Sequence, residues 1–226
     1  MSSALISDRA QSSPTATNGG SSSRVVRRVL DVGEKLILLV CYSIFLVPVV
    51  QAVASHCDLG ACLLAASETL VVALVLVRKP AQVLSQRPLD WFLAFGATLA
   101  PTLVRPIHGS SSPLANLAVL LMVVGICLQI GSKAMLGRRF GLVAANRGIC
   151  ASGPYRIVRH PIYMGYLLTH IGFLCISPSS WNVMVYALAY SLMIPRIFAE
   201  ERLLGLDPLY IAYTSRVRWR LIPGVL

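Results

Sequence analysis

The segment 153–165, GPYRIVRHPIYMG, concentrates side chains that can do chemistry next to an apolar run. Two tyrosines, two arginines and a histidine fall within nine positions, and the acidic pair Glu200 and Glu201 follows about 35 residues later. Ionisable side chains beside a bilayer are costly to place, so they mark candidate functional positions. We therefore predict that this segment and the acidic pair form one site at the edge of a membrane.

The residue types favour binding and orienting a polar ligand over metal chemistry. Arg196 and Glu200 are spaced i, i+4, so on a continuous helix they share one face. An arginine fork can aim a carboxylate, and a glutamate can bind an ammonium group or a diol. The alternative is a plain surface ion pair. The sequence has no CxxC, HExxH, GxGxxG or P-loop pattern, so it predicts no metal site and no soluble-type nucleotide fold.

The stretch from residue 133 to 161 supplies the loop material for such a site. Pro161 stands where a helix is expected to begin, a position at which its missing N–H costs nothing. The free N–H groups of that helix start predict a place for a carboxylate or phosphate. Four glycines in the stretch permit tight turns, and they are Gly137, Gly141, Gly148 and Gly153.

Composition places the chain in a membrane. Of its 226 residues, 56% are hydrophobic and only 13% are charged, and the mean hydropathy is +0.70. A soluble domain has about a quarter charged residues. The third and fifth apolar blocks are short for a bilayer of about 30 Å, so five spans is the alternative to six. The six blocks predict transmembrane helices at 36–54, 59–77, 89–104, 114–136, 162–177 and 181–198.

The distribution of charge favours six spans with both termini in the cytoplasm. With that topology 19 of the 20 lysines and arginines lie on the cytoplasmic side, as the positive-inside rule requires, and only Arg105 lies outside. The net charge of +11 is then explained by topology and by contact with anionic lipid headgroups. We therefore predict membrane lipids as partners and no nucleic acid.

Residues 1–23 are rich in serine, threonine, alanine and glycine and lack the apolar core of a signal peptide. They predict a disordered cytoplasmic tail, followed by one membrane domain at 24–226. Within the second apolar block, Glu68 is expected near the middle of the bilayer, where a charged carboxylate is costly. It either lines a substrate cavity or is a protonated carboxyl that hydrogen-bonds to Ser67.

Three runs together resemble the isoprenylcysteine carboxyl methyltransferase family: GPYRIVRHPIYMG, then RIFAEERLLG after a helical hairpin, then PLYIAYTSRVRWRLIPG. That family is related to the integral-membrane phospholipid N-methyltransferases. The resemblance covers about residues 130–226 and rests on RHPxYxG in combination with the Glu-Glu pair. It implies an all-α, multi-pass fold in which S-adenosylmethionine is held by a cytoplasmic loop and a C-terminal helical hairpin.

The resemblance also implies roles for individual residues. Glu200 matches a cofactor-binding acid, and Arg196 matches the arginine that orients the acceptor carboxylate. A family glutamine has no clear counterpart, and Asn146 is the nearest candidate. The other matched cofactor contacts are Arg147, Gly148, Ile149 and Cys150, mostly through backbone groups, and then Tyr155, His160, Pro161, Ile162 and Tyr163.

These features predict S-adenosylmethionine-dependent methylation of a carboxylate on a lipophilic acceptor. Methylation of a phospholipid amine or a small thiol is the first alternative, and there Glu68 would receive the acceptor. A sterol-reductase-like oxidoreductase and a non-catalytic membrane scaffold are the others. The site is expected to face the cytoplasm, from the inner membrane of a bacterium or the endoplasmic reticulum of a eukaryote. The sequence leaves the identity of the acceptor and the oligomeric state open.

Overall fold

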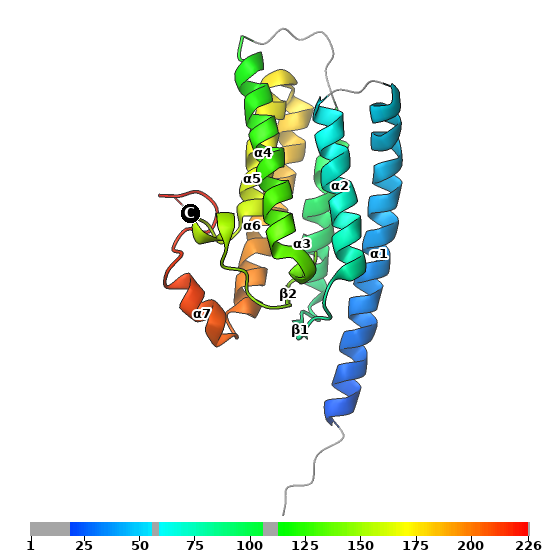
Figure 1. Ribbon diagram of the computed structural model, residues 1–226, viewed down its shortest axis with the longest axis vertical. Coiled ribbons are helices and arrows are strands. Elements are labelled where there is room, and N and C mark those ends of the chain that lie inside the picture. Colours follow the sequence, from blue (N-terminus) through cyan, green and yellow to red (C-terminus); the bar gives the residue numbers. More distant parts are fainter. Residues whose placement is uncertain (1–18, 56–58, 106–112, 226) are drawn as a thin grey trace, which may run out of the picture.

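The computed structural model describes residues 19–55, 59–105 and 113–225. Within these ranges the chain is mostly helical, as predicted, and the long helices form an elongated bundle (Figure 1). Three short 3-10 turns are η1 (Ala100–Leu103), η2 (Gly137–Arg139) and η3 (Gly153–Arg156). The α-helices are α1 (Gly19–Ser55), α2 (Leu59–Val77), α3 (Pro88–Leu99), α4 (Ala115–Leu136), α5 (Pro161–Ile176), α6 (Ser180–Leu204) and α7 (Pro208–Thr214).

Each of the six predicted apolar blocks coincides with a helix, from α1 to α6, and η1 completes the third block after α3. The start of α1 differs from the prediction. This helix begins at Gly19, so residues 19–23 are helical where the tail was expected to continue to residue 23. Valines and leucines recur at helical spacing through RVVRRVLDVGEKL, so the helix extends ahead of the apolar block, and residues 19–23 form its first turn. Residues 1–18 of the predicted tail lie outside the described residues.

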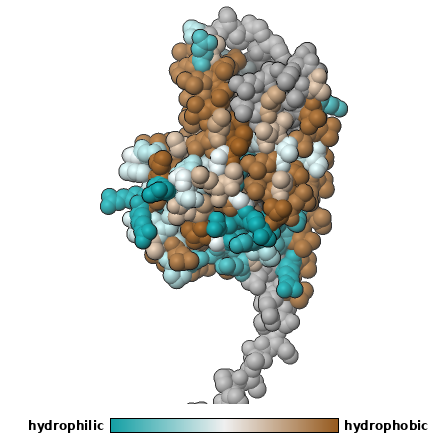
Figure 2. Space-filling model, viewed as in Figure 1, coloured by the Kyte–Doolittle hydropathy of each residue, from teal (hydrophilic) through white to brown (hydrophobic). Residues whose placement is uncertain are grey.

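Within the described ranges two helices are long and apolar enough to cross a membrane, at Ala115–Arg139 and Ser180–Leu204. Shorter apolar helices occupy Ala65–Val77 and Pro161–Ile176. Figure 2 shows hydrophobic side chains over much of the bundle, with hydrophilic ones gathered toward the end that carries β1, β2 and α7 in Figure 1. Large exposed apolar side chains on α1, α4 and α6, such as Ile44, Leu120 and Met184, fit contact with lipid. Six complete spans remain a prediction.

Close backbone contact joins α4 to α5. A Cβ on Gly125 of α4 would lie 2.7 Å from the Gly165 carbonyl of α5, and a Cβ on Gly172 would lie 2.6 Å from the Ala118 carbonyl. Glycines therefore let the two helices approach more closely than larger residues would allow, as in other membrane helix pairs. Because η3 leads directly into α5, this packing fixes the position of the RHPxYxG segment.

At the hydrophilic end, loops and helices are tied together by polar contacts. A two-residue ladder that the all-helical prediction lacks pairs β1 (Val83–Leu84) with β2 (Ala145–Asn146). Arg202 Nη2 of α6 lies 2.7 Å from Asp90 Oδ2 of α3. The backbone N–H groups of Arg159 and His160 donate to carbonyls of the C-terminal segment, at Trp219 and Arg220. These contacts hold the loop after α4 and the C-terminal segment against the start of α5.

The antiparallel packing of α3 and α6 yields a test of the topology. Asp90 meets Arg202 at one end of this pair, and the Leu103 carbonyl accepts a hydrogen bond from the Trp181 indole at the other. We expect a cysteine at Gln86, in a cysteine-free background, to react with a membrane-impermeant thiol reagent only from the cytoplasmic side. A cysteine at Ser180 should react only from the opposite side. Labelling of both positions from one side would contradict the predicted topology.

Candidate active site

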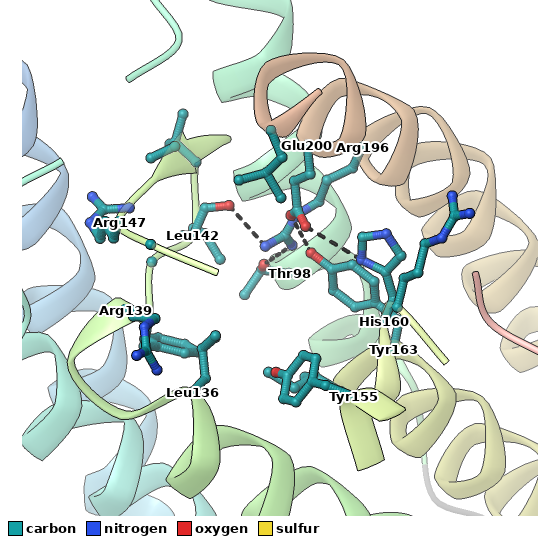
Figure 3. A pocket seen from close by; sticks show the side chains of 18 of the residues that line it. Thr98, Leu136, Arg139, Leu142, Arg147, Tyr155, His160, Tyr163, Arg196 and Glu200 are labelled. Carbon is teal, nitrogen blue, oxygen red and sulfur yellow. Dashed lines mark hydrogen bonds and ion pairs between the residues drawn. The ribbon is translucent and has the colours of Figure 1, made fainter. Parts of the chain in front are cut away.

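A cavity of about 140 Å³ lies where the loop after α4, the segment from η3 into α5 and the last turns of α6 meet. The side chains labelled in Figure 3 surround this space. The fold thus brings together residues from separate sequence motifs. Eight of the predicted site residues line the cavity, namely Arg147, Gly148, Tyr155, His160, Ile162, Tyr163, Arg196 and Glu200.

Glu200 is the carboxylate at which the polar groups of this cavity converge. The Tyr163 hydroxyl donates a hydrogen bond to Glu200 Oε1, and Arg196 Nε lies 3.2 Å from the same oxygen. His160 Nδ1 lies 3.7 Å from Glu200 Oε2. The Arg196 side chain is 8% exposed and that of Glu200 is 20% exposed. The pair is therefore not a solvent-exposed surface ion pair, and its desolvation is offset by further hydrogen bonds.

Arg196 is held in one orientation by acceptors on every side. Its Nη1 lies 3.1 Å from Thr98 Oγ1, and its Nη2 donates to the Leu142 carbonyl at 2.9 Å. Its guanidinium also stacks over the Tyr163 ring, 5.2 Å from the ring centroid. Apart from Glu200 these hydrogen-bond acceptors are neutral. A ligand carboxylate that replaced one of them would make a stronger, charge-assisted hydrogen bond.

Glu201 does not line the cavity and instead holds the C-terminal segment. Its Oε2 accepts a hydrogen bond from Arg220 Nε at 2.7 Å, and its Oε1 lies 3.2 Å from Arg159 Nη1. His160 Nε2 lies 3.4 Å from the same Oε1. His160 therefore lies between the two neighbouring carboxylates. We assign Glu201 to structure, since its partners fasten the chain after α7 to the RHP turn.

The loop that ends in Arg147 forms one wall of the cavity. Arg147 Nη2 lies 2.6 Å from Asp31 Oδ1 and 2.9 Å from Glu34 Oε2, both on α1. Gly148 has a φ of +102°, which L side chains rarely adopt. Asn146 accepts the Gly148 N–H with its side-chain oxygen. A tight turn thereby directs the Arg147 guanidinium toward α1.

Four predicted cofactor contacts do not line the cavity. The Asn146 amide donates to Asp207 at the start of α7, so it fastens the loop to the C-terminal region. Ile149 packs against the cluster of Tyr210 and Tyr213, and the Cys150 thiol lies 3.5 Å from the Met135 carbonyl. Pro161 is fully buried under the cavity wall. A linear motif gives the order of these residues but not which of them face the cavity.

The start of α5 is a weaker anion site than the sequence predicts. Pro161 has no N–H, and the N–H groups of Tyr163 and Met164 already donate to the His160 carbonyl. Several lining residues also escaped the sequence analysis. Tyr42, Thr98 and Tyr166 lie within apolar helices and have no motif around them. Tyr210 is spaced i, i+3 from Tyr213, which is typical of packing residues.

A second and larger cavity of about 760 Å³ adjoins the first. Glu68 lines it, together with Ser67, Gln129 and His170. Lys133, whose charge acts on Glu68, donates a hydrogen bond to Ser67 at 2.8 Å. The rest of the lining is largely apolar. Four residues line both cavities and thus mark their junction, and these are Tyr42, Thr98, Tyr166 and Arg196.

Tyr155 and Tyr213, at the hydrophilic end of the bundle, keep their phenolic protons at neutral pH. Burial raises the pKa of Tyr155 well above its ordinary value, and burial raises the pKa of Tyr213 to about 12. The Tyr213 hydroxyl donates to the Tyr155 carbonyl at 2.7 Å. This bond fixes η3 against α7 and so sets the position of the Tyr155 ring in the cavity.

Residues 114–205 match the family model for phospholipid methyltransferases, a family of integral-membrane methyltransferases that includes the isoprenylcysteine carboxyl methyltransferases. This confirms the resemblance that the sequence motifs indicated. Among the curated proteins there is no significant match to the chain. The matched region contains α4, α5 and α6 and the whole cavity-lining loop between α4 and α5. Among the described residues no cluster of histidine, cysteine or acidic side chains could hold a metal ion.

The chemistry of the cavity fits S-adenosylmethionine, the methyl donor general to this family. Glu200 would suit its ammonium group or ribose diol, and the rings of His160 and Tyr155 would suit its adenine. The Tyr210 hydroxyl is buried in the lining and has no hydrogen-bond partner among the described residues, so it is available to a ligand. The volume is below the roughly 300–1,000 Å³ of small-molecule pockets, so the walls would have to move apart on binding.

The contact between Gly141 and Arg147 predicts opposite effects for two glycine substitutions. A Cβ on Gly141 would lie 2.2 Å from Arg147 Nη1, whereas a Cβ on Gly131 of α4 would meet nothing within 4 Å. Gly141→Ala should displace the Arg147 guanidinium and destabilise the protein by about 1–3 kcal/mol. Gly131→Ala should be neutral or stabilising, since alanine favours helices by about 1 kcal/mol. Thermal unfolding in detergent measures both, and equal midpoints would contradict the assigned packing.

Proposed function

We propose that this chain is a multi-pass membrane enzyme that uses S-adenosylmethionine to methylate a carboxylate on a lipophilic acceptor. The observation that carries the proposal is the pair of adjoining cavities that share Arg196. The smaller cavity lies at the hydrophilic end of the bundle. It is called the polar cavity because charged side chains such as Glu200 and Arg147 line it. The larger lies among the apolar helices. A water-soluble donor and a membrane-embedded acceptor would each have a compartment, and the reacting atoms would meet where the compartments join.

The donor side of the site is assigned to the polar cavity. We expect Glu200, with Tyr163 and His160 beside it, to bind the polar groups of the donor. Arg147, Gly148 and Ile162 would form the walls, as the family resemblance implies. Asn146, Ile149, Cys150 and Pro161 would support these walls from behind, because their side chains lie outside the cavity lining. S-adenosylmethionine, when bound, supplies a methyl group already activated by its sulfonium charge.

The acceptor side is assigned to the larger cavity. Its apolar lining suits a lipid chain, and Arg196 stands at the end nearest the donor. A carboxylate is already a nucleophile at neutral pH, so no residue has to remove a proton from it. The bound donor would supply the methyl carbon, which would gain a bond to one carboxylate oxygen as its bond to sulfur breaks and S-adenosylhomocysteine leaves. Arg196 would orient that oxygen, and the surrounding helices would exclude water.

A second candidate function is methylation of a phospholipid amine or a small thiol in the same cavities. Glu68 favours it, because a carboxylate in the wall of a membrane cavity suits a cationic acceptor. The family match supports methyl transfer over a sterol-reductase-like reaction or a scaffold role. In either methylation the enzyme would reside in the inner membrane of a bacterium or in the endoplasmic reticulum, with the polar cavity facing the cytoplasm.

Binding of the donor is tested by substitutions at the two ends of the polar cluster. Glu200→Gln and His160→Ala should each weaken S-adenosylmethionine binding roughly tenfold or more, because each removes a hydrogen bond to a charged group worth about 1.5–3 kcal/mol. Isothermal titration or equilibrium dialysis of detergent-purified protein measures the affinity.

Glu201→Gln is the matched control, since it makes the same chemical change one residue away. It should lower the unfolding midpoint through the loss of charge beside Arg159 and Arg220, with a smaller change in affinity than Glu200→Gln. Donor affinity that is the same in the Glu200 and His160 variants as in the wild type would remove both residues from the donor site.

The acceptor class is tested through Arg196 and Glu68. If the acceptor is a carboxylate, Arg196→Lys should lower turnover by about a hundredfold, because lysine keeps the charge but loses the planar fork that fixes the reacting oxygen. Glu68→Gln should then have little effect. An amine or thiol acceptor predicts the reverse order of the two variants. Methyl transfer to prenylcysteine, phosphatidylethanolamine and methanethiol, measured for both variants, separates the two candidate functions.

A further inference from the structure

A cluster of charged side chains joins α1, which lies outside the region that matches the family, to the cavity-lining loop inside that region. Asp31 and Glu34 of α1 meet Arg78, which follows α2, and Arg147 of the cavity-lining loop. The Glu34 side chain is 0% exposed. Charges removed from water this completely are costly unless every lone pair has a partner. The groups that hold the Glu34 carboxylate therefore decide what this cluster contributes.

Glu34 differs from Asp31 in what it holds. Its Oε1 accepts hydrogen bonds from the backbone N–H groups of Leu142 and Val143, at 2.8 and 3.0 Å. Its Oε2 lies 2.9 Å from Arg147 Nη2. The Glu34 carboxylate thus binds the loop at two places, the backbone N–H groups of the loop and the Arg147 side chain. Asp31 contacts the two arginines, through Oδ1 for both and through its backbone carbonyl for Arg78.

The backbone of Leu142 links this carboxylate to the proposed reaction site. Its N–H donates to Glu34, and its carbonyl accepts from Arg196 Nη2 at 2.9 Å. Leu142 and Val143 also line the polar cavity. Because hydrogen bonds within a buried network strengthen one another, the orientation of Arg196 depends on where Glu34 holds this residue.

We infer that Glu34 is a positioning residue for methyl transfer: it fixes the loop 140–147 from α1 and thereby fixes the Arg196 guanidinium at the junction of the two cavities. The effect of Glu34 on methyl transfer rests on the proposed function. Its effect on the loop rests on the contacts alone. It makes the N-terminal helix part of the site, although no residue of α1 belongs to the matched region 114–205.

The two acids permit a matched comparison, because both substitutions remove one negative charge from the same cluster. The Glu34→Gln side chain has one acceptor oxygen in place of two. Its NH2 group must therefore face either the loop N–H groups or the arginines, and in both cases two hydrogen-bond donors oppose each other. In Asp31→Asn the amide oxygen can keep the place of Oδ1 for both arginines. The loop should therefore loosen in the first variant and stay in place in the second.

Hydrogen–deuterium exchange of amides 140–148, without added ligand, reports the loop, and methyl-transfer turnover at saturating donor and acceptor reports the site. Glu34→Gln should raise exchange locally, with protection in α4 and α5 kept, and should lower turnover roughly tenfold or more. Asp31→Asn should stay within about threefold of the wild type, since its hydrogen bonds are conserved. If the two variants behave alike in both measurements, the cluster only balances charge and the inference fails.

The design separates failure of this inference from failure of the proposed function. A wild-type protein that transfers no methyl group to prenylcysteine, phosphatidylethanolamine or methanethiol contradicts the proposed function, whatever the variants do. The exchange contrast between Glu34→Gln and Asp31→Asn still decides whether Glu34 fixes the loop. An active wild type with unchanged exchange and turnover in Glu34→Gln overturns the positioning role alone.

Discussion

The site depends on the contact between Arg196 and Glu200 inside a bundle of apolar helices. Both side chains are largely shielded from water, so each charge must be paired and hydrogen-bonded. Arg196 takes its remaining partners from α3 and from the loop after α4, while Glu200 takes its own from the start of α5. One buried ion pair therefore fixes the relative positions of three separate segments. This explains how a chain with few polar residues can build a defined polar cavity.

Adjacent glutamates on one helix divide two tasks between them. Glu200 points into the cavity, and Glu201 joins Arg159 and Arg220 to hold the C-terminal segment. His160 lies between the two carboxylates and so couples the cavity to that segment. The Glu-Glu motif is thus a junction between a binding function and a structural one. A substitution at either glutamate is therefore expected to alter the surroundings of the other through the His160 imidazole.

Much of the fold was predictable from the sequence, because apolar blocks specify helices directly: α2 and α4 begin and end within one residue of their predicted limits. RHPxYxG and the Glu-Glu pair also indicated the region of the cavity. Thr98 and Tyr42 were missed because single polar groups in apolar helices carry no periodic signal. Glu34 was missed because its partners in the loop lie more than a hundred residues away. Asn146 and Cys150, which the resemblance matched to cofactor contacts, do not line the cavity, since a linear motif does not say which way a turn directs each residue.

Direct binding of the donor tests the central claim, that the polar cavity holds S-adenosylmethionine. Labelled S-adenosylmethionine and labelled NADPH should be titrated separately onto the detergent-purified wild-type chain. The account predicts saturable binding of S-adenosylmethionine that is displaced by S-adenosylhomocysteine, and no saturable binding of NADPH. Saturable binding of NADPH without binding of S-adenosylmethionine would contradict it.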